Sequence, residues 1–287
     1  MSDIHPTAVI DSDVKIGRNV VIEPYVVIKG SVTVGDNVAI KSHVYIEGNI
    51  SIGEGSVIYP GASIGTKAQA SMATTGSNVS GDVASRITIG RYCEIREFVT
   101  INSPYNEGSV VSVGDHCLIM AYCHIAHHCK VGKHVIMTNG VTLGGYVEVE
   151  DYAHIGGLTP IHQFVRVGCF AMVGGLSRVV SDIPPYTLGG GNPYRLGGLN
   201  LVGLKRHKFR LNLRKNLTKA FKLTYRSGYH LEEALKRVSE EVELSKEIQH
   251  WIDFCKHSKR GLIGLQPAVN IGLDRNEIPE YTDLLEM

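Results

Sequence analysis

The sequence predicts a mainly β protein, in which a parallel β-helix is followed by a small C-terminal α-helical domain. Aliphatic residues recur at every sixth position over two long blocks, and Gly and small residues recur at fixed places between them. After Val179 this repeat stops and apolar residues take a helical spacing. We therefore expect a β-helix of hexapeptide repeats over 1–186, a connecting segment over 187–207, and a helical domain over 208–287.

The six-residue repeat predicts the β-helix. All eleven residues at steps of six over 4–64 are Ile or Val, three more follow over 89–101, and all twelve over 113–179 are apolar. A period of six matches neither an α-helix nor a plain alternating strand, but it fits short strands separated by regular corners. Gly often comes next, as in Ile16-Gly17, where we expect it to provide the positive φ of a corner. Three hexads then form a triangular coil of eighteen residues with its aliphatic side chains inside.

Two segments without hexads interrupt the repeat. Residues 67–86 are rich in Ser, Ala, Gly and Thr, and residues 103–109 are shorter and polar. Both patterns predict loops that leave the coils. Loops on a rigid scaffold often contact ligands or neighbouring subunits, although they can also be plain spacers.

The C-terminal part changes character at the prolines Pro184 and Pro185, which cannot donate to a strand ladder. Helical spacing then predicts three helices, which begin near Lys208, Leu231 and Ile248. The stretch from about Gln266 has no periodicity, so we expect it to be loosely ordered.

Basic residues are concentrated between Ile183 and Leu231, where ten Lys or Arg residues occur without any Asp or Glu. Such a surface favours an anionic partner, for example a diphosphate or an acidic protein, or it is simply a solvated basic helix. No nucleic-acid module is present and aromatic residues are not interleaved as stacking platforms, so we expect no nucleic acid partner.

The remaining composition points to a cytoplasmic protein. No apolar run approaches the length of a membrane span, so we expect no stable membrane insertion. The first residues lack the features of a secretory signal. Four of the six Cys residues fall at one place in the repeat and no Cys-x-x-Cys pair occurs, which favours buried reduced thiols over a zinc or disulfide framework.

Histidines in the later coils suggest a catalytic site. Adding eighteen twice to residue 127 gives 145 and 163, so His127, Gly145 and Gln163 should stack in one column, with His128 and His162 beside it. We expect the His127 side chain to point outward. A neutral imidazole can take a proton from a hydroxyl, and a Gly N–H one coil away can stabilise an oxyanion.

Several motifs, in a fixed order, resemble the UDP-N-acetylglucosamine acyltransferase family, and the resemblance extends to about Gly261. The motifs are His124–Cys129, Leu143–Gly145, Ile161–Phe164, Asp182–Tyr186, Gly191–Pro193 and Asn200–Arg206. The resemblance to hexapeptide-repeat proteins implies that the β-helix is a single-stranded left-handed parallel one and that the chain forms a homotrimer.

The resemblance also implies an activity. It implies transfer of a 3-hydroxyacyl chain from acyl carrier protein to the 3-position of UDP-N-acetylglucosamine, the first step of lipid A biosynthesis, without a metal or cofactor. His127 matches the general base and Gly145 matches the donor to the oxyanion. The acidic carrier protein would account for the basic surface. Substrate contacts are expected at Gln69, His124, Tyr146, His162, Gln163, Gly175, Asn200 and Arg206.

Three positions depart from the family pattern. Tyr146 stands where many members carry His, and His128 stands where Asp or Asn is common. After Gln69 the chain reads Ala70-Ser71-Met72, where the family usually has Asp-Leu-Lys. These differences leave open whether the acceptor atom is a 3-hydroxyl or a 3-amino group.

Two other functions remain alternatives. One is a diverged relative that has kept the fold without catalysis, which the changed residues after Gln69 motivate. The other is a zinc lyase resembling the trimeric β-helix carbonic anhydrases, which place three His at a subunit interface. The long basic helical segment argues against the zinc enzyme.

Overall fold

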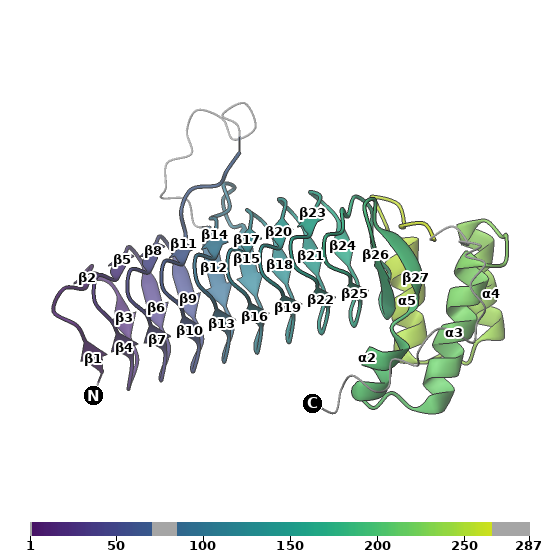
Figure 1. Cartoon of the computed structure of the whole chain (residues 1–287), viewed down its shortest axis with the longest axis horizontal. Helices are drawn as coiled ribbons and strands as arrows, with labels where there is room; N and C mark the ends of the chain where they lie inside the picture. Colours follow the sequence, from purple (N-terminus) through teal and green to yellow (C-terminus); the bar gives the residue numbers. More distant parts are fainter. Residues whose placement is uncertain (1, 71–84, 266–287) are drawn as a thin grey trace, which may run out of the picture.

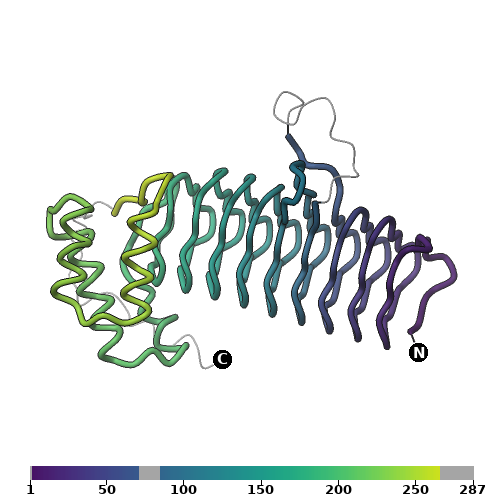
Figure 2. Tube along the Cα trace, turned by 180° about the vertical axis from the view of Figure 1, so that it is seen from behind, coloured from purple at the N-terminus to yellow at the C-terminus, as the bar shows by residue number. Residues whose placement is uncertain are grey.

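The protein is a long three-sided column of stacked coils that carries helices at its C-terminal end (Figure 1). The computed structural model describes residues 2–70 and 85–265. The same view from behind shows the coils stacked along one axis, with the helices gathered beyond the last of them (Figure 2). Among the described residues, no helix has the length and apolar character needed to cross a membrane.

Three sheets form the three walls of the column. The first contains β1 (Asp3–Ile4), β4 (Val21–Ile22), β7 (Ala39–Ile40), β10 (Val57–Ile58), β13 (Glu94–Ile95), β16 (Leu118–Ile119), β19 (Ile136–Met137), β22 (His154–Ile155), β25 (Met172–Val173), β26 (Thr187–Gly190) and β27 (Arg195–Leu199). The second contains β2 (Val9–Ile10), β5 (Val27–Lys29), β8 (Tyr45–Glu47), β11 (Ser63–Ile64), β14 (Thr100–Ile101), β17 (His124–Ile125), β20 (Thr142–Leu143) and β23 (Pro160–Ile161). The third contains β3 (Lys15–Ile16), β6 (Val32–Val34), β9 (Ile50–Ile52), β12 (Arg86–Ile89), β15 (Val110–Val113), β18 (Lys130–Val131), β21 (Glu148–Val149) and β24 (Arg166–Val167).

The strand register confirms the coil of eighteen residues. Strands of successive coils pair in parallel, so that Ile125 lies opposite Leu143 and Leu143 opposite Ile161. Where a loop is inserted, paired residues are more than eighteen positions apart. Ile64 pairs with Ile101, and Ile101 pairs with Ile125. The loops therefore leave the column without disturbing the pairing of the coils.

The aliphatic residues of the hexads fill the interior, as the repeat predicts. From Ile22 to Val179 each described hexad aliphatic is at most 3% exposed. Burial of this many branched side chains supplies the main favourable term in folding. Within the described residues no coil packs on the N-terminal side of the first one, and Ile4 there is 43% exposed.

The predicted reason for glycine after the aliphatic residue holds at Gly65, where φ is +97°, but it is wrong at Gly17 and Gly53. Gly17 and Gly53 do not take a positive φ, which instead occurs at the third residue after the aliphatic one, as at Asn19 and His128. Glycine is needed because the next coil is too close. A Cβ on Gly53 would lie 2.5 Å from the carbonyl carbon of Gly90.

This crowding predicts a destabilised variant. Gly53→Ala should lower the free energy of unfolding by about 1–3 kcal/mol, because the new Cβ meets backbone that cannot rotate away. Gly264→Ala is the matched control, since the nearest atom to its Cβ would be 3.9 Å away. Thermal unfolding of both variants checks this, and equal melting temperatures would contradict it.

The chain after β25 forms more structure than the expected connecting segment. A hairpin of β26 and β27 extends the first sheet, with β26 parallel to β25 and β27 antiparallel to β26. A short helix, α2 (Leu201–Arg206), follows directly. Apolar periodicity did not predict this hairpin, because glycines occupy many of its positions.

Three further helices cover the end of the column, close to the positions that the helical spacing predicts. They are α3 (Leu211–Tyr225), α4 (Leu231–Glu241) and α5 (Lys246–Lys256). Trp251 of α5 is fully buried and donates a hydrogen bond to the Thr224 hydroxyl over 3.1 Å. After α5 the chain returns to the column, where Asp182 N–H donates to the Gly261 carbonyl. The stretch from Gln266 onward lies outside the described residues.

Candidate active site

The coil register brings His127 against Gly145. Both residues lie two positions after a paired aliphatic residue of the second sheet, Ile125 in one coil and Leu143 in the next. A Cβ on Gly145 would overlap the imidazole ring and lie 2.7 Å from its Nε2 atom. Glycine at this position therefore lets the backbone of one coil approach the ring of the coil before it. Gln163 occupies the equivalent place in the third coil.

The Gly145 amide can donate a hydrogen bond to a ligand. In other coils the equivalent N–H is held by an Asp of the next coil, as when Arg18 donates to Asp36 over 2.8 Å and Lys133 donates to Asp151 over 2.7 Å. Within residues 2–70 and 85–265 no atom accepts a hydrogen bond from the N–H of Gly145. An oxygen that gains negative charge beside it would be stabilised.

His127 is paired with His128. The two Nδ1 atoms are 2.9 Å apart, so one ring donates its hydrogen and the other accepts it. When His127 is the donor, its Nε2 atom keeps a lone pair beside Gly145. The Nε2 atom of His128 is buried and has no hydrogen-bond partner in the described structure.

A tyrosine covers the histidine pair. Tyr105, in the loop over 103–109, places its ring 4.9 Å from that of His127 and 4.7 Å from that of His128. Its hydroxyl lies 3.1 Å from the hydroxyl of Tyr146, whose ring stacks on His128 at 4.3 Å. His127 is consequently only 7% exposed. The expectation of an outward side chain is correct relative to the column, but the loop buries it.

Burial keeps these imidazoles neutral. It lowers the pKa of His127, and burial together with His127 lowers the pKa of His128 to about 4. Burial is also the main reason that the pKa of His124 is lowered. A neutral ring can accept a proton, so His127 is suited to act as a base near pH 7.

The lowered pKa of His127 predicts the acid side of a pH profile. If His127 Nε2 must be unprotonated, kcat/KM for the reaction proposed below should fall with acid at a midpoint below the usual histidine value of about 6.5. Rate measurements between about pH 4.5 and 8 check this. A midpoint at or above that usual value would contradict a buried base.

Other predicted site residues lie around the stack of His127, Gly145 and Gln163. His124 is held by a 2.7 Å hydrogen bond between its Nδ1 atom and the Thr100 hydroxyl. His162 is exposed and its Nδ1 atom lies 3.1 Å from the carbonyl oxygen of Gln163. Gln69 is exposed in the described start of the loop over 67–86. Residues 71–84 of that loop, including Ser71 and Met72, lie outside the described residues.

The start of this loop is tied to the same wall as His127. The Asn102 side chain donates to the Thr66 hydroxyl and to the carbonyl of Lys67, over 2.9 Å and 3.0 Å. The Asn102 N–H donates to the carbonyl of Ile125, two residues before His127. Gln69 therefore belongs to a segment that is anchored beside the stack of His127, Gly145 and Gln163.

Three predicted residues lie elsewhere in the chain. Gly175 is at a corner that follows β25 of the first sheet, not at the corner of His127. Asn200 caps α2, since its side chain accepts from Gly203 N–H and donates to the Phe170 carbonyl. Arg206 is exposed in the last turn of α2. Within one chain, these three residues therefore lie away from the corner that holds His127, Gly145 and Gln163.

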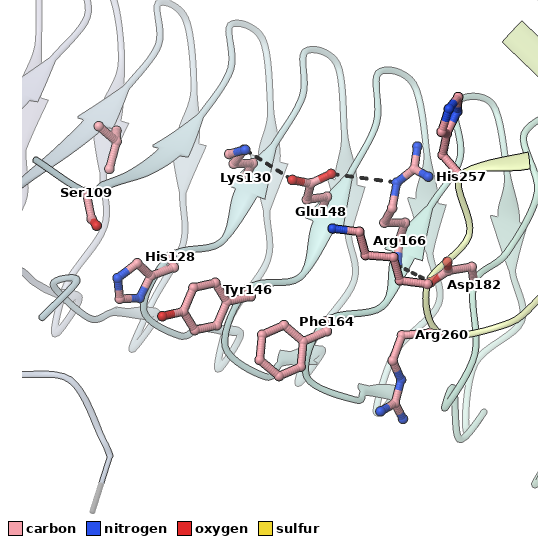
Figure 3. A pocket seen from close by; sticks show the side chains of 12 residues that line it. Ser109, His128, Lys130, Tyr146, Glu148, Phe164, Arg166, Asp182, His257 and Arg260 are labelled. Atoms are coloured by element: carbon pink, nitrogen blue, oxygen red, sulfur yellow. Dashed lines mark hydrogen bonds and ion pairs between the residues drawn. The ribbon is translucent and has the colours of Figure 1, made fainter. Parts of the chain in front are cut away.

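A cavity of about 770 Å³, lined by aromatic and charged side chains, opens beside His128 and Tyr146 (Figure 3). His128, Tyr146 and Phe164 form one edge. Its floor is a row of charges, with Glu148 between Lys130 at 3.1 Å and Arg166 at 3.7 Å. Lys259 and Arg260, from the segment after α5, close the far end. The hexad pattern alone did not predict this cavity, although the spacing of eighteen between residues 130, 148 and 166 indicates that these three charged side chains stack.

Comparison with known proteins decides the family. A family model described as Bacterial transferase hexapeptide (six repeats) matches residues 31–66 and 111–145, and one described as Udp N-acetylglucosamine O-acyltransferase; Domain 2 matches residues 182–263. A relative from Chlamydia abortus, named acyl-[acyl-carrier-protein]–UDP-N-acetylglucosamine O-acyltransferase, is 51% identical over 263 residues, which cover 91% of this chain and 92% of the relative. The chain belongs to the UDP-N-acetylglucosamine O-acyltransferase family. This confirms the family resemblance that the motifs predict.

Solved structures of this acyltransferase family share the fold. The UDP-N-acetylglucosamine acyltransferase from Bacteroides fragilis has a TM-score of 0.84 and 36% identity, and the match covers 91% of this chain and 99% of that one. The enzyme from Campylobacter jejuni has a TM-score of 0.83 and 38% identity, with 92% and 100% covered. The predicted β-helix with C-terminal helices is therefore confirmed.

Proposed function

We propose that this chain transfers a 3-hydroxyacyl group from acyl carrier protein to the 3-position of UDP-N-acetylglucosamine, the first step of lipid A biosynthesis. The observation that carries the proposal is the close approach of the His127 ring to Gly145, where an added Cβ would overlap the ring, together with a Gly145 N–H that has no acceptor in the described residues. A base beside an oxyanion donor is the arrangement that acyl transfer needs. The names of the relatives support the same substrates.

The geometry suggests how the reaction proceeds. His127 Nε2 takes the proton of the sugar 3-hydroxyl while that oxygen attacks the thioester carbonyl carbon. The carbonyl oxygen becomes negatively charged and accepts a hydrogen bond from Gly145 N–H. The intermediate then expels the carrier thiolate, which receives the proton from His127. His128 accepts the Nδ1 hydrogen of His127 throughout and so fixes its tautomer.

Substrates must move Tyr105 to reach the base. His127 is 7% exposed and its ring lies against that tyrosine, so Tyr105 restricts the access of a sugar hydroxyl or a thioester to Nε2. The loop over 103–109 has exposed residues at 106–108, and it contains no hexad whose aliphatic side chain would hold it to the interior of the β-helix. We propose that it shifts when the acceptor binds.

An assay with the two substrates tests the proposed function. Purified protein should form acylated UDP-N-acetylglucosamine from 3-hydroxyacyl carrier proteins, and a series of chain lengths should identify the preferred acyl group. Mass spectrometry identifies the product, and a 3-amino analogue of the sugar tests the identity of the acceptor atom. Binding of the sugar nucleotide without turnover of any acyl chain would support the non-catalytic alternative instead.

The basic surface between Ile183 and Leu231 is proposed to bind the acidic carrier protein. Its exposed Lys208 and Lys215 would attract an anionic partner over a distance of about a Debye length. The double variant Lys208→Glu/Lys215→Glu should raise KM for the carrier substrate about tenfold and leave kcat near that of the parent. Lys246→Glu, at a lysine that is 91% exposed on α5, is the control. Steady-state rates at low salt measure the effect, and an unchanged KM would contradict this role.

We also propose a homotrimer located in the cytoplasm. Large aromatic side chains are exposed at successive corners, among them Tyr92 at 50%, Phe98 at 53% and Tyr122 at 65%. Phe98 and Tyr122 stack on each other at one corner of successive coils, and Tyr92 lies at another corner. Exposed aromatic side chains of this kind favour contact with another copy of the chain. Light scattering of the purified chain would measure its mass, and a monomer at micromolar concentration would contradict the trimer.

A further inference from the structure

A second group of reactive side chains lies where α5 packs on the last coils. Glu150 follows β21, Cys169 follows β24, and His250 belongs to α5. A carboxylate oxygen of Glu150, the Cys169 Sγ atom and a ring nitrogen of His250 all lie within 4.8 Å of one another. His250 Nε2 is 2.7 Å from the Glu150 carboxylate, although the two residues are 100 positions apart. No other three His, Cys, Asp or Glu side chains in the described residues converge in this way.

The chemistry of these three groups suits a zinc ion. Imidazole, thiolate and carboxylate are the ligands that Zn²⁺ takes in proteins, with bond lengths of about 2.0–2.3 Å and a tetrahedral arrangement. Those bond lengths place ligand atoms roughly 3.3–3.7 Å apart, so the three atoms need only small shifts to surround an ion. We propose that Glu150, Cys169 and His250 bind zinc and that the ion joins α5 to the end of the β-helix.

Neighbouring groups already orient the ligands. The Cys169 N–H donates to the Glu150 Oε2 atom over 2.9 Å, and Arg166 lies 3.5 Å from the Oε1 atom. The His250 ring is flanked by the rings of Tyr186 and Phe254, with centroids 6.4 Å and 6.3 Å away. Such outer groups fix ligand geometry and limit solvent around a metal. The three ligands are themselves half-buried, which leaves a path for an ion from solution.

Cys169 distinguishes this group from an ordinary ion pair. A His250–Glu150 pair needs no thiol, yet the thiol lies beside both of its members. The cysteines buried inside the coils behave differently, since Cys117 and Cys129 donate to the carbonyls of Gly132 and Gly144. The site is also separate from His127, because its coil residues follow strands of the third sheet whereas His127 follows a strand of the second.

An ion must compete with a proton for His250. Zinc binds a neutral imidazole and a thiolate, so metal binding releases protons and strengthens as the pH rises. Measurements at about pH 8 therefore favour detection of the site.

Cobalt titration of the metal-free full-length chain tests the proposal. Co²⁺ in place of zinc should give a near-ultraviolet thiolate-to-metal absorption band that saturates at one ion per chain, and excess Zn²⁺ should abolish it. Cys169→Ser should remove the band, while His250→Gln and Glu150→Gln should each weaken binding by at least about tenfold. Zinc should raise the melting temperature of the parent and leave that of Cys169→Ser unchanged.

Two control variants make the outcome specific. Cys255→Ser removes a different thiol, which belongs to α5, and His257→Gln removes an exposed histidine at the end of that helix. Both should keep the cobalt band. Circular dichroism identifies any variant that fails to fold. A folded parent without a thiolate band, or a band that survives in Cys169→Ser, would overturn the proposal, and acyl transfer by the parent would not alter either result.

Discussion

Replacing His127 with Ala should lower kcat for acyl transfer about 100- to 10,000-fold, the range that a positioned general base contributes. The reason is that Ala cannot take the proton of the attacking hydroxyl, and in the described residues the ring that an added Cβ on Gly145 would meet first is that of His127. The affinity for UDP-N-acetylglucosamine should change much less. Steady-state rates with a saturating 3-hydroxyacyl carrier protein measure the effect.

The variant needs a folding control because His127 is buried. Loss of its ring leaves a space under Tyr105, so the melting temperature should be compared with that of the parent. His134→Ala is the matched variant, since this histidine stacks on His116 and Tyr152 at a different corner and should retain activity. Turnover by folded His127→Ala close to the parental rate would remove His127 from the mechanism.

Adding one methyl group at Gly145 should also be severe. In Gly145→Ala the new Cβ overlaps the His127 ring, so the ring must turn away from the attacking oxygen and the methyl group blocks approach to the amide. Loss of one oxyanion donor costs about 100- to 1,000-fold in kcat, and we expect at least that decrease. The measurement is the same steady-state assay.

A control variant shows whether the loss depends on where the methyl group is added. Gly198→Ala adds the same group where nothing lies within 4 Å, and it should keep full activity. If Gly145→Ala folds and turns over as fast as Gly198→Ala, the Gly145 amide and its contact with His127 do not serve catalysis.

The sequence predicts much of the column because its structure is local and periodic. Each hexad aliphatic needs only its place in the repeat to point inward, so the pairing of Ile125 with Leu143 and Ile161 follows from counting. The same counting places His127 next to Gly145. Helices α3, α4 and α5 follow from apolar spacing for a similar reason, because one face of each is buried.

The features that sequence reasoning missed depend on contacts between distant segments. Tyr105 covers His127 from a loop that has no repeat, and nothing in that loop's composition fixes where the ring points. His250 meets Glu150 across 100 positions, which no spacing rule connects. Gly53 needs to be glycine because the Gly90 backbone is close. These two residues belong to adjacent coils, but the loop inserted between them increases their separation in the sequence beyond eighteen.

A double variant tests most directly whether residues 127 and 145 form one catalytic unit. Groups that act together give strongly non-additive losses when both are removed. His127→Ala/Gly145→Ala should therefore lose clearly less activity than the product of the two single losses, by more than the roughly twofold scale of additivity errors, because part of the Gly145→Ala loss comes from displacement of the His127 ring. A double variant whose loss equals the product of the two single losses would mean that the two residues act independently, which contradicts the arrangement described for this site.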